Sequence, residues 1–310
     1  MDVVVLGHII IETVVFPDGS VLTPVLGSPA AYSSVAMARL GNRVGLCTKV
    51  GKDIPKEFIE VFNRAGVDLK GMRIVGREST RNKLIYTTPE SKRVEYLSKA
   101  PDIEFYDIPD TFKEASLFYL CPMDYEVPPR VVEKLANEGK EVVVDLGGYG
   151  GATSATHPDG AESKLSVTIE VVSMCGIIKA SIEDCRYIFG ETHTSEPERH
   201  YADKLLTMGA KRVVITLGSK GVYYADMDVN KRFPPLACKA IDPTGAGDAF
   251  AAGMIHGYLW DKGDIDTMIM FGQATACCVV ERTGGVIPER MPSKEEVQQK
   301  LRKEVVNGRD

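Results

Sequence analysis

The 310-residue sequence contains no apolar run long enough to cross a bilayer, no internal repeat and no low-complexity segment. Its net charge of −6 shows none of the basic excess with which proteins bind nucleic acid or an anionic membrane surface. Residues 1–7 carry no basic leader, so we expect a first buried strand there rather than a signal peptide. These absences predict a cytoplasmic protein that has no nucleic-acid or membrane partner.

Histidine and cysteine do not show the spacing of a metal site. The five histidines include no pair at metal-ligand spacing, and the seven cysteines include no C-x-x-C pair. Most of the cysteines stand in apolar stretches, where a free thiol packs as a small hydrophobic group. We therefore expect neither a structural zinc nor a disulfide framework, as in a protein of a reducing compartment.

What the sequence does contain is a regular alternation of short apolar runs and helix-like periodic segments. Such alternation predicts an α/β fold, in which helices cover both faces of a mostly parallel central sheet. The predicted buried strands are Asp2–Leu6, Val44–Val50, Leu117–Leu120, Val142–Asp145, Gly176–Lys179 and Arg212–Leu217. The predicted helices are Ala30–Leu40, Ile54–Ala65, Arg130–Glu138, Ile182–Phe189, Glu198–Met208, Gly247–Leu259, Thr267–Arg282 and a last one that follows a capping box at Ser293.

Two regions interrupt this alternation with short β-rich segments. We expect their strands within about residues 9–26 and 72–98, where they would form a small separate sheet. Such a sheet is either an edge meander that only packs or a lid over a binding site. The segments are Ile9–Phe16, Val21–Leu26, Arg73–Val75, Asn82–Thr87 and Arg93–Leu97.

The most informative segment is residues 241–254, a glycine-rich turn that leads into a predicted helix. Gly245 and Gly247 lack Cβ atoms, so the backbone there can approach a ligand closely. The unpaired N–H groups at the start of the helix and its positive dipole end would bind a phosphoryl group. Asp248 either caps the helix or takes a proton from an attacking hydroxyl, while the amides of Gly245, Ala246 and Gly247 hold the phosphoryl group.

Two other phosphate-binding motifs are excluded by their spacing. Residues 45–53 look like a P-loop, but the glycines stand one residue too far apart, and Asp53 replaces the Ser or Thr that would hold magnesium. Gly245, Gly247 and Gly253 do not have the spacing of the dinucleotide fingerprint. A nicotinamide-dependent dehydrogenase is therefore a remote alternative.

The residues around Asp248 resemble the second signature of the ribokinase-like (PfkB) family of carbohydrate and nucleoside kinases. That signature reads D-T/P-x-G-A-G-D-x-F followed by small residues and a glycine, and its spacing matches Thr244, Gly245, Gly247, Asp248 and Gly253. The resemblance covers nearly the whole chain. It implies one kinase domain over residues 1–310, with the small sheet as a lid.

The resemblance assigns a substrate side to N-terminal residues. Residues 27–41 resemble the first family signature, G-G-x-x-x-N ending in L-G, but Ser28 replaces its second glycine and Tyr32 its sugar-binding asparagine. We expect Gly27, Ser28 and Tyr32 at the substrate, although Tyr32 could instead fill the core edge. Glu12 stands where most members carry an Asp that holds two substrate hydroxyls. A carboxylate suits a vicinal diol, and the alternative is a solvent-facing strand residue.

The resemblance also implies a site for ATP and Mg²⁺. The family's N-x-x-E motif resembles residues 181–184, so Asp184, with Glu183 as a competitor, is expected to hold Mg²⁺ through water. Ser181 either lies at the nucleotide or simply caps a helix. Asp242 and Thr244 match positions near a monovalent-cation site, which implies K⁺. The residues expected around the nucleotide itself are Thr216, Gly218, Ser219, Gly221, Ala276, Cys277, Val280, Gly284, Gly285 and Val286.

The lid region raises two expectations about partners. In the family the lids can pair between subunits, and the apolar strand Ile9–Val15 could serve as such an edge in a homodimer. A basic run in the same region either faces an anionic substrate or is a solvated strand face. The run consists of Lys70, Arg73, Arg77, Arg81 and Lys83.

Together these expectations describe an ATP-dependent kinase that phosphorylates a hydroxyl of a small polyol, with Asp248 as base. Tyr32 in place of Asn argues against ribose itself, and Lys179-Ala180-Ser181 resembles inositol and other sugar kinases. A sugar or cyclitol is therefore the first expectation for the acceptor, and a nucleoside the second. A non-catalytic sensor that binds sugar or nucleotide is the alternative from another class.

Overall fold

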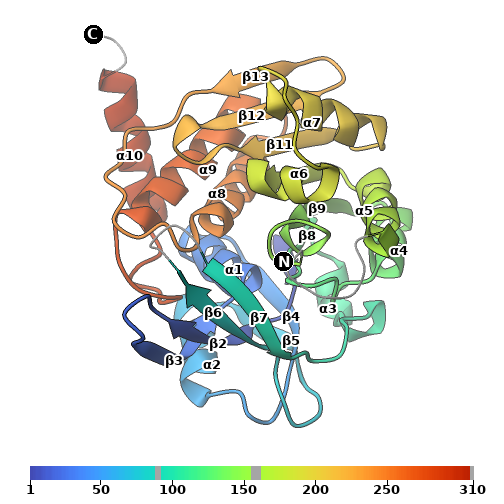
Figure 1. Cartoon of the computed structure of the whole chain (residues 1–310), viewed down its shortest axis with the longest axis vertical. Coiled ribbons are helices and arrows are strands. Elements are labelled where there is room, and N and C mark those ends of the chain that lie inside the picture. The colour runs from blue at the N-terminus through green and yellow to red at the C-terminus, as the bar shows by residue number, and fades with distance from the viewer. Residues whose placement is uncertain (88–91, 155–161, 308–310) are drawn as a thin grey trace.

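The computed structural model describes residues 1–87, 92–154 and 162–307, and a nine-stranded sheet runs through its centre (Figure 1). The strand order is β13-β12-β11-β10-β9-β8-β1-β4-β5. All pairs from β11 to β5 are parallel, and antiparallel pairs add β12 and β13 at one edge. The strands are β1 (Val3–Leu6), β4 (Val44–Val50), β5 (Asp68–Ile74), β8 (Leu117–Leu120), β9 (Glu141–Asp145), β10 (Ile177–Ser181), β11 (Arg212–Thr216), β12 (Val222–Asp226) and β13 (Asn230–Phe233).

Helices cover both faces of this sheet, because alternate side chains of each strand point to opposite sides. In β1, Val3 and Val5 join one buried cluster, and Val4 and Leu6 join another. The first cluster packs against α1 (Pro29–Arg39), α2 (Lys56–Ala65), α8 (Ala246–Trp260) and α9 (Ile265–Val280), and α10 (Lys294–Asn307) packs on α9. The second packs against α3 (Asp110–Lys113), α4 (Pro129–Asn137), α5 (Glu162–Met174), α6 (Ile182–Phe189) and α7 (Pro197–Thr207). The predicted fold class is confirmed.

A second sheet of four strands stands beside the first, in the order β3-β2-β6-β7 (Figure 1). The predicted hairpin pairs β2 with β3 in antiparallel register, and β6 runs parallel to β2. Residues 88–91, within the second expected lid range, lie outside the described residues. The four strands are β2 (Ile10–Val15), β3 (Val21–Gly27), β6 (Arg81–Tyr86) and β7 (Lys92–Ser98).

The expectation that Arg73–Val75 belongs to the small sheet is wrong. Arg73 and Ile74 end β5, where they pair with Lys49 and Val50 of β4 in the large sheet. The described part of the chain contains no helix that is both long and apolar enough to cross a membrane.

The turn before α8 lies beyond the carboxyl ends of central strands, where α/β sheets bind ligands. Thr216 ends β11 and lines the same pocket as Gly247. Close packing of α8 on α9 holds the turn there. A Cβ atom at Gly253 would lie 2.4 Å from Thr275 Oγ1, so the two helices approach more closely than larger side chains would permit.

Candidate active site

The glycine-rich turn places Asp248 in the first turn of α8. Gly245 is the N-cap residue, with a φ of 77°, and Asp248 lies three residues further on and is half-buried. The N–H of Ala246 donates to Pro243 O at 3.1 Å, so this amide has a protein partner. No backbone carbonyl of the described residues accepts from the N–H of Gly245 or Gly247. These two amides, at the positive end of the helix dipole, are therefore suited to bind an anion.

A buried lysine that the sequence analysis did not assign to the site lies beside this turn. Lys179 Nζ is 2.7 Å from Asp145 Oδ2, and a Cβ atom at Gly247 would be 3.3 Å from the same nitrogen. Burial lowers the pKa of Lys179, but the charges of Asp145, Asp184 and Asp248 outweigh burial and raise it. The side chain is therefore an ammonium ion next to the anion-binding amides.

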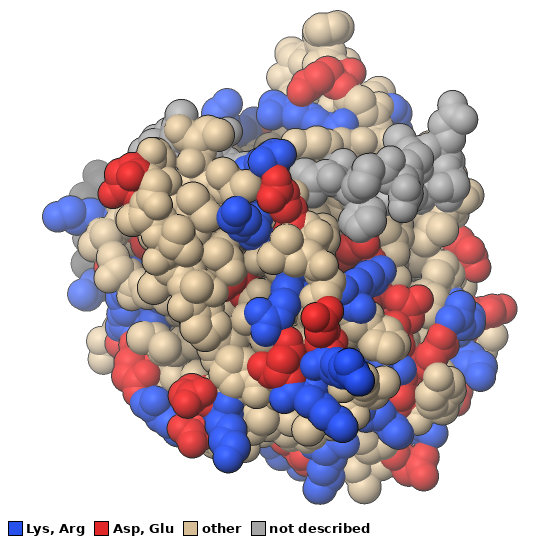
Figure 2. Space-filling view, turned by 60° about the horizontal axis from the view of Figure 1, so that its bottom comes forward, with Lys and Arg blue, Asp and Glu red and all other residues tan. Residues whose placement is uncertain are grey.

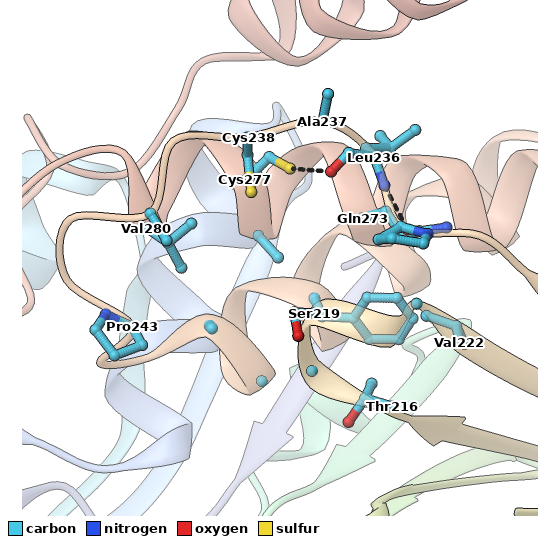
Figure 3. A pocket seen from close by; sticks show the side chains of 18 residues that line it. Thr216, Ser219, Val222, Leu236, Ala237, Cys238, Pro243, Gln273, Cys277 and Val280 are labelled. Atoms are coloured by element: carbon cyan, nitrogen blue, oxygen red, sulfur yellow. Dashed lines mark hydrogen bonds between the residues drawn. The ribbon is translucent and has the colours of Figure 1, made fainter. Parts of the chain in front are cut away.

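A pocket of about 560 Å³ opens beside the same turn (Figure 3). Ala246 and Gly247 line it, so the pocket and the anion-binding turn are continuous. Gly221 has a φ of 94°, and a Cβ atom there would be 2.1 Å from Phe233 O, which is why a larger side chain would not fit. Of the residues predicted around the nucleotide, seven line the pocket: Thr216, Gly218, Ser219, Gly221, Ala276, Cys277 and Val280.

None of the other predicted nucleotide or metal residues lines this pocket; they are Ser181, Glu183, Asp184, Asp242, Thr244, Gly284, Gly285 and Val286. Gly285 does not line the pocket and instead faces the small sheet, because a Cβ atom there would be 3.7 Å from Val25 Cγ1. Ser181 caps α6, since its hydroxyl accepts from the N–H of Asp184 at 3.0 Å. Glu183 is exposed.

Asp184 uses most of its acceptor capacity within the protein. Its Oδ2 accepts from the N–H and the hydroxyl of Ser181, both at 2.7 Å, and its Oδ1 accepts from the N–H of Ala152 at 2.8 Å. A carboxylate has about four acceptor positions, so one remains. The described residues contain no cluster of three His, Cys, Asp or Glu side chains that could hold a metal. Asp184 thus keeps one acceptor position for a further donor, such as a water molecule of a hydrated cation.

On the small sheet, Glu12 is buried rather than solvent-facing. Its Oε1 accepts from Asn82 Nδ2 at 3.1 Å, and its carboxyl group packs directly on Gly27, where a Cβ atom would be 2.1 Å from Glu12 Cδ. Asn82 is fully buried, and its Oδ1 has no hydrogen-bond partner among the described residues. A buried carbonyl oxygen without a partner is costly in free energy, so this side chain is suited to receive a ligand hydroxyl.

Tyr32 and Ser28 shape the site mainly through packing. A Cβ atom at Gly245 would be 2.5 Å from the Tyr32 ring, so the ring covers the turn. Burial raises the pKa of Tyr32, which keeps the phenol neutral. Ser28 caps α1 by accepting from the N–H of Ala31 at 3.1 Å.

The predicted K⁺ positions, Asp242 and Thr244, contact a buried arginine instead. The main-chain carbonyls of both residues accept from Arg290 Nη2, at 3.1 and 3.0 Å. The oxygens expected to hold a monovalent cation are therefore bonded to a guanidinium group of this chain, and the site does not fit K⁺.

Three residues of the basic run, Lys70, Arg73 and Arg81, form ion pairs with neighbouring acids. Lys70 lies 3.3 Å from Asp68, and Arg81 lies 2.7 Å from Asp53. Figure 2 shows acidic and basic side chains interspersed over the face that comes forward when the bottom of Figure 1 is turned to the viewer. These contacts support the solvated strand face rather than an anionic-substrate site.

The sequence alone does not identify Lys179, Asp145, Asn82 and Arg290 as site residues. For Lys179 and Asp145 a signal exists, because each charged side chain ends an apolar run that was predicted as a buried strand. Asn82 and Arg290 have polar neighbours in the sequence, and the local pattern does not distinguish them from ordinary surface residues.

Comparisons with known proteins agree with this geometry. A sequence model of the family described as "pfkB family carbohydrate kinase" matches residues 2–292. The chain is 33% identical to the cytidine kinase of Thermococcus kodakarensis over 264 residues, which are 83% of this chain and 88% of that protein. It is 27% identical to the nucleoside kinase of Methanothermobacter thermautotrophicus over 298 residues, which are 91% and 90% of the two chains.

Among solved structures, the fold is similar to that of the ribokinase of Arabidopsis thaliana complexed with ribose and ATP. The TM-score is 0.77 at 18% identity, and the match covers 97% of this chain and 98% of that one. At this level of identity the likeness concerns the fold alone.

Proposed function

The chain belongs to the pfkB family of carbohydrate kinases, and on this premise we propose that it transfers the γ-phosphoryl group of ATP to a hydroxyl of a nucleoside. The sequence alone favours a sugar or cyclitol as the acceptor, with a nucleoside second. Relatives with 33% and 27% identity are a cytidine kinase and a nucleoside kinase, and they lead us to favour the nucleoside.

The position of Asp248 between two binding regions carries this proposal. On one side, Ala246 and Gly247 line the pocket that suits ATP. On the other side, the charges of Asp248 and Glu12 both act on Tyr32, which covers the turn at Gly245. A carboxylate in this place can reach an acceptor held near Glu12 and a phosphoryl group held at the turn.

In the proposed reaction, Asp248 takes the proton of the acceptor hydroxyl as its oxygen attacks the γ-phosphorus. The new P–O bond forms while the bond to the ADP oxygen breaks, and ADP leaves with that electron pair. The amides of Gly245 and Gly247 and the ammonium of Lys179 stabilise the charge on the transferred group. Mg²⁺, bound to the ATP phosphates and held by Asp184 through water, would neutralise charge on those phosphates.

The small sheet supplies the acceptor contacts in this proposal. The Glu12 carboxylate and the buried Asn82 Oδ1 are two acceptors side by side, which suits the two hydroxyls of a ribose diol. Held in this way, a nucleoside would direct its primary hydroxyl toward Asp248. The small sheet would then act as a lid that excludes water as a competing acceptor.

An acceptor panel tests the proposal. Purified protein is incubated with Mg-ATP and cytidine, uridine, adenosine, guanosine, ribose, fructose or myo-inositol, and ADP release is measured for each. We expect a nucleoside to have a kcat/KM at least ~100-fold above that of any free sugar, because a free sugar lacks the base, and contacts with non-reacting parts of a substrate contribute to transition-state binding. Phosphorus NMR of the product should show a primary phosphomonoester.

Two results would contradict the proposal in different ways. A higher kcat/KM for a sugar or for myo-inositol than for any nucleoside would show that the acceptor is a sugar or cyclitol, as the sequence alone favours. ATP binding without ADP release on any acceptor would identify a non-catalytic sensor.

A further inference from the structure

Arg290 lies in the loop between α9 and α10, and its side chain is fully buried. Its Nε donates to Arg282 O at 3.1 Å, and its Nη1 donates to Gly284 O. Its Nη2 donates to the carbonyls of Asp242 and Thr244 and lies 3.2 Å from Asp242 Oδ2. One guanidinium group therefore joins four main-chain carbonyls and a carboxylate.

These partners belong to two segments that meet behind the anion-binding turn. Asp242 and Thr244 directly precede Gly245, and Arg282 and Gly284 follow α9. A guanidinium group carries five N–H donors in a rigid plane, so it holds the carbonyls in one relative arrangement. The arrangement of Asp242 and Thr244 in turn sets the direction of the next amides, including that of Gly245.

Tyr32 connects the same guanidinium group to the front of the turn. Arg290 Cζ is 5.9 Å from the centroid of the Tyr32 ring, and Nη1 is 3.5 Å from the Tyr32 hydroxyl. The ring itself covers Gly245. Arg290 thus contacts the turn in two ways. It binds the carbonyls of Asp242 and Thr244 directly, and it contacts the Tyr32 ring, which covers Gly245.

This arrangement leaves no place for a monovalent metal ion. Carbonyl oxygens are the ligands that replace the hydration shell of K⁺, and here they are bonded to Arg290. A second cation among the same oxygens would lie close to the guanidinium in a buried, low-dielectric place, where like charges repel strongly.

We propose that Arg290 is a built-in cation that positions the anion-binding turn, so that phosphoryl transfer by this protein needs no monovalent metal ion. The proposal rests on the kinase function proposed above. Arg290 acts through the turn and does not touch the reacting atoms, so it is a positioning residue.

The wild-type protein provides the first test. Activity with the best acceptor is measured in KCl and in choline chloride at equal ionic strength. We expect kcat to change by less than about twofold between them, because general screening is matched and the carbonyl oxygens behind the turn are already bonded to Arg290. Activation by K⁺ of about tenfold or more would overturn the proposal, since that is the scale of a lost electrostatic contact at a transition state.

Variants at Arg290 provide the second test. Arg290→Ala should lower kcat by about 10²–10³-fold with a smaller change in the KM for ATP, because the amides lose their fixed direction. KCl or millimolar guanidinium chloride should restore part of the loss, and choline chloride should not. Arg290→Lys keeps the positive charge but lacks the rigid, planar set of donors. Its kcat should therefore lie between that of the wild type and that of Arg290→Ala. Arg43→Ala removes an exposed arginine paired with Asp2 and should leave kcat unchanged.

A loss in Arg290→Ala that neither cation restores would show a packing role alone and overturn the proposal. Thermal unfolding keeps the test separate from the kinase proposal, because it requires no turnover. KCl in place of choline chloride should raise the Tm of Arg290→Ala by about 2–4 °C and leave that of the wild type unchanged. A K⁺-dependent rise in the wild-type Tm would contradict the proposal even if no acceptor is ever found. If Arg290→Ala does not fold, the wild-type comparisons in KCl and choline chloride decide the question.

Discussion

At the scale of single residues, His256 of α8 is a buried titratable group away from the reacting atoms. Its Nδ1 lies 2.8 Å from Asn42 Oδ1, which can only accept, so the Nδ1 carries the proton. The ring packs edge-on against Phe271 with centroids 5.2 Å apart. Burial, together with the positive charge of Lys294, lowers the pKa of His256 from 6.5 to about 4.

The lowered pKa of His256 predicts a loss of stability in mild acid. As the pH falls from 6.5 to 4, the unfolded chain takes up a proton on this histidine and the folded chain does not. The free energy of unfolding should therefore fall over this range by about 3 kcal/mol from this group, and level off below it. Urea unfolding of the wild type and of His256→Gln at several pH values measures the stability difference between them, and the stability of the wild type relative to the variant should fall by about 3 kcal/mol from pH 7 to pH 4. Equal pH dependence in the two proteins would contradict the lowered pKa.

Single residues of the site differ in how far the sequence predicts them. Asp248 is predicted because its neighbours in the chain are the glycines that give it a role. Lys179 and Arg290 depend on Asp145 and Asp242, which are 34 and 48 residues away in the chain. A local pattern does not report such partners, and the same side chains would be ordinary solvated charges without them.

At the scale of elements, α1 begins at a strained residue. Ser28 is its N-cap, with a φ of 108° and a ψ of 154°, a conformation that normally requires glycine. The related kinases resembled by residues 27–41 carry glycine at this place. The strain therefore explains the family's glycine, and the serine adds a capping hydrogen bond to Ala31 in partial compensation.

Two substitutions at Ser28 should change stability in opposite directions. Ser28→Gly removes about 1 kcal/mol or more of backbone strain and loses only a few tenths from the cap, so it should stabilise the protein. Ser28→Ala keeps the strain and loses the cap, at a cost of about 1 kcal/mol. Calorimetric Tm values of the wild type and the two variants measure these changes in stability. A glycine variant less stable than the alanine variant would show that the positive φ carries no strain.

Buried elements are predicted from sequence better than edge elements. β1 and β8 are continuous apolar runs, and β4 is apolar apart from Thr48 and Lys49, because both faces of a parallel sheet are covered. β13 is not predicted, since three of its four residues are exposed and polar and show no apolar alternation. The apolar pattern of a strand also does not specify which other strand it pairs with. For this reason the sequence does not reveal that Arg73 belongs to the large sheet, where it pairs with Lys49.

At the scale of the whole molecule, the site lies where three parts of the chain meet. The candidate residues are Lys179 within β10 and Thr216 at the end of β11 in the large sheet, Asp248 in α8 and Glu12 in the small sheet. The family resemblance predicts this convergence. Residue periodicity alone predicts the layers but not which loops come together, because that depends on strand order.

The turnover of Asp248→Asn with Mg-ATP and the best acceptor tests most directly whether the Asp248 carboxylate is the base. Asp264→Asn is the matched control, because Asp264 caps α9 by accepting from the N–H of Thr267 and Asn caps a helix equally well. ATP affinity of both variants is measured separately. We expect Asp248→Asn to bind ATP and to lose about 10²–10⁴-fold in kcat, while the control keeps wild-type turnover. An Asp248→Asn protein that retains most of its turnover would show that this carboxylate is not the base.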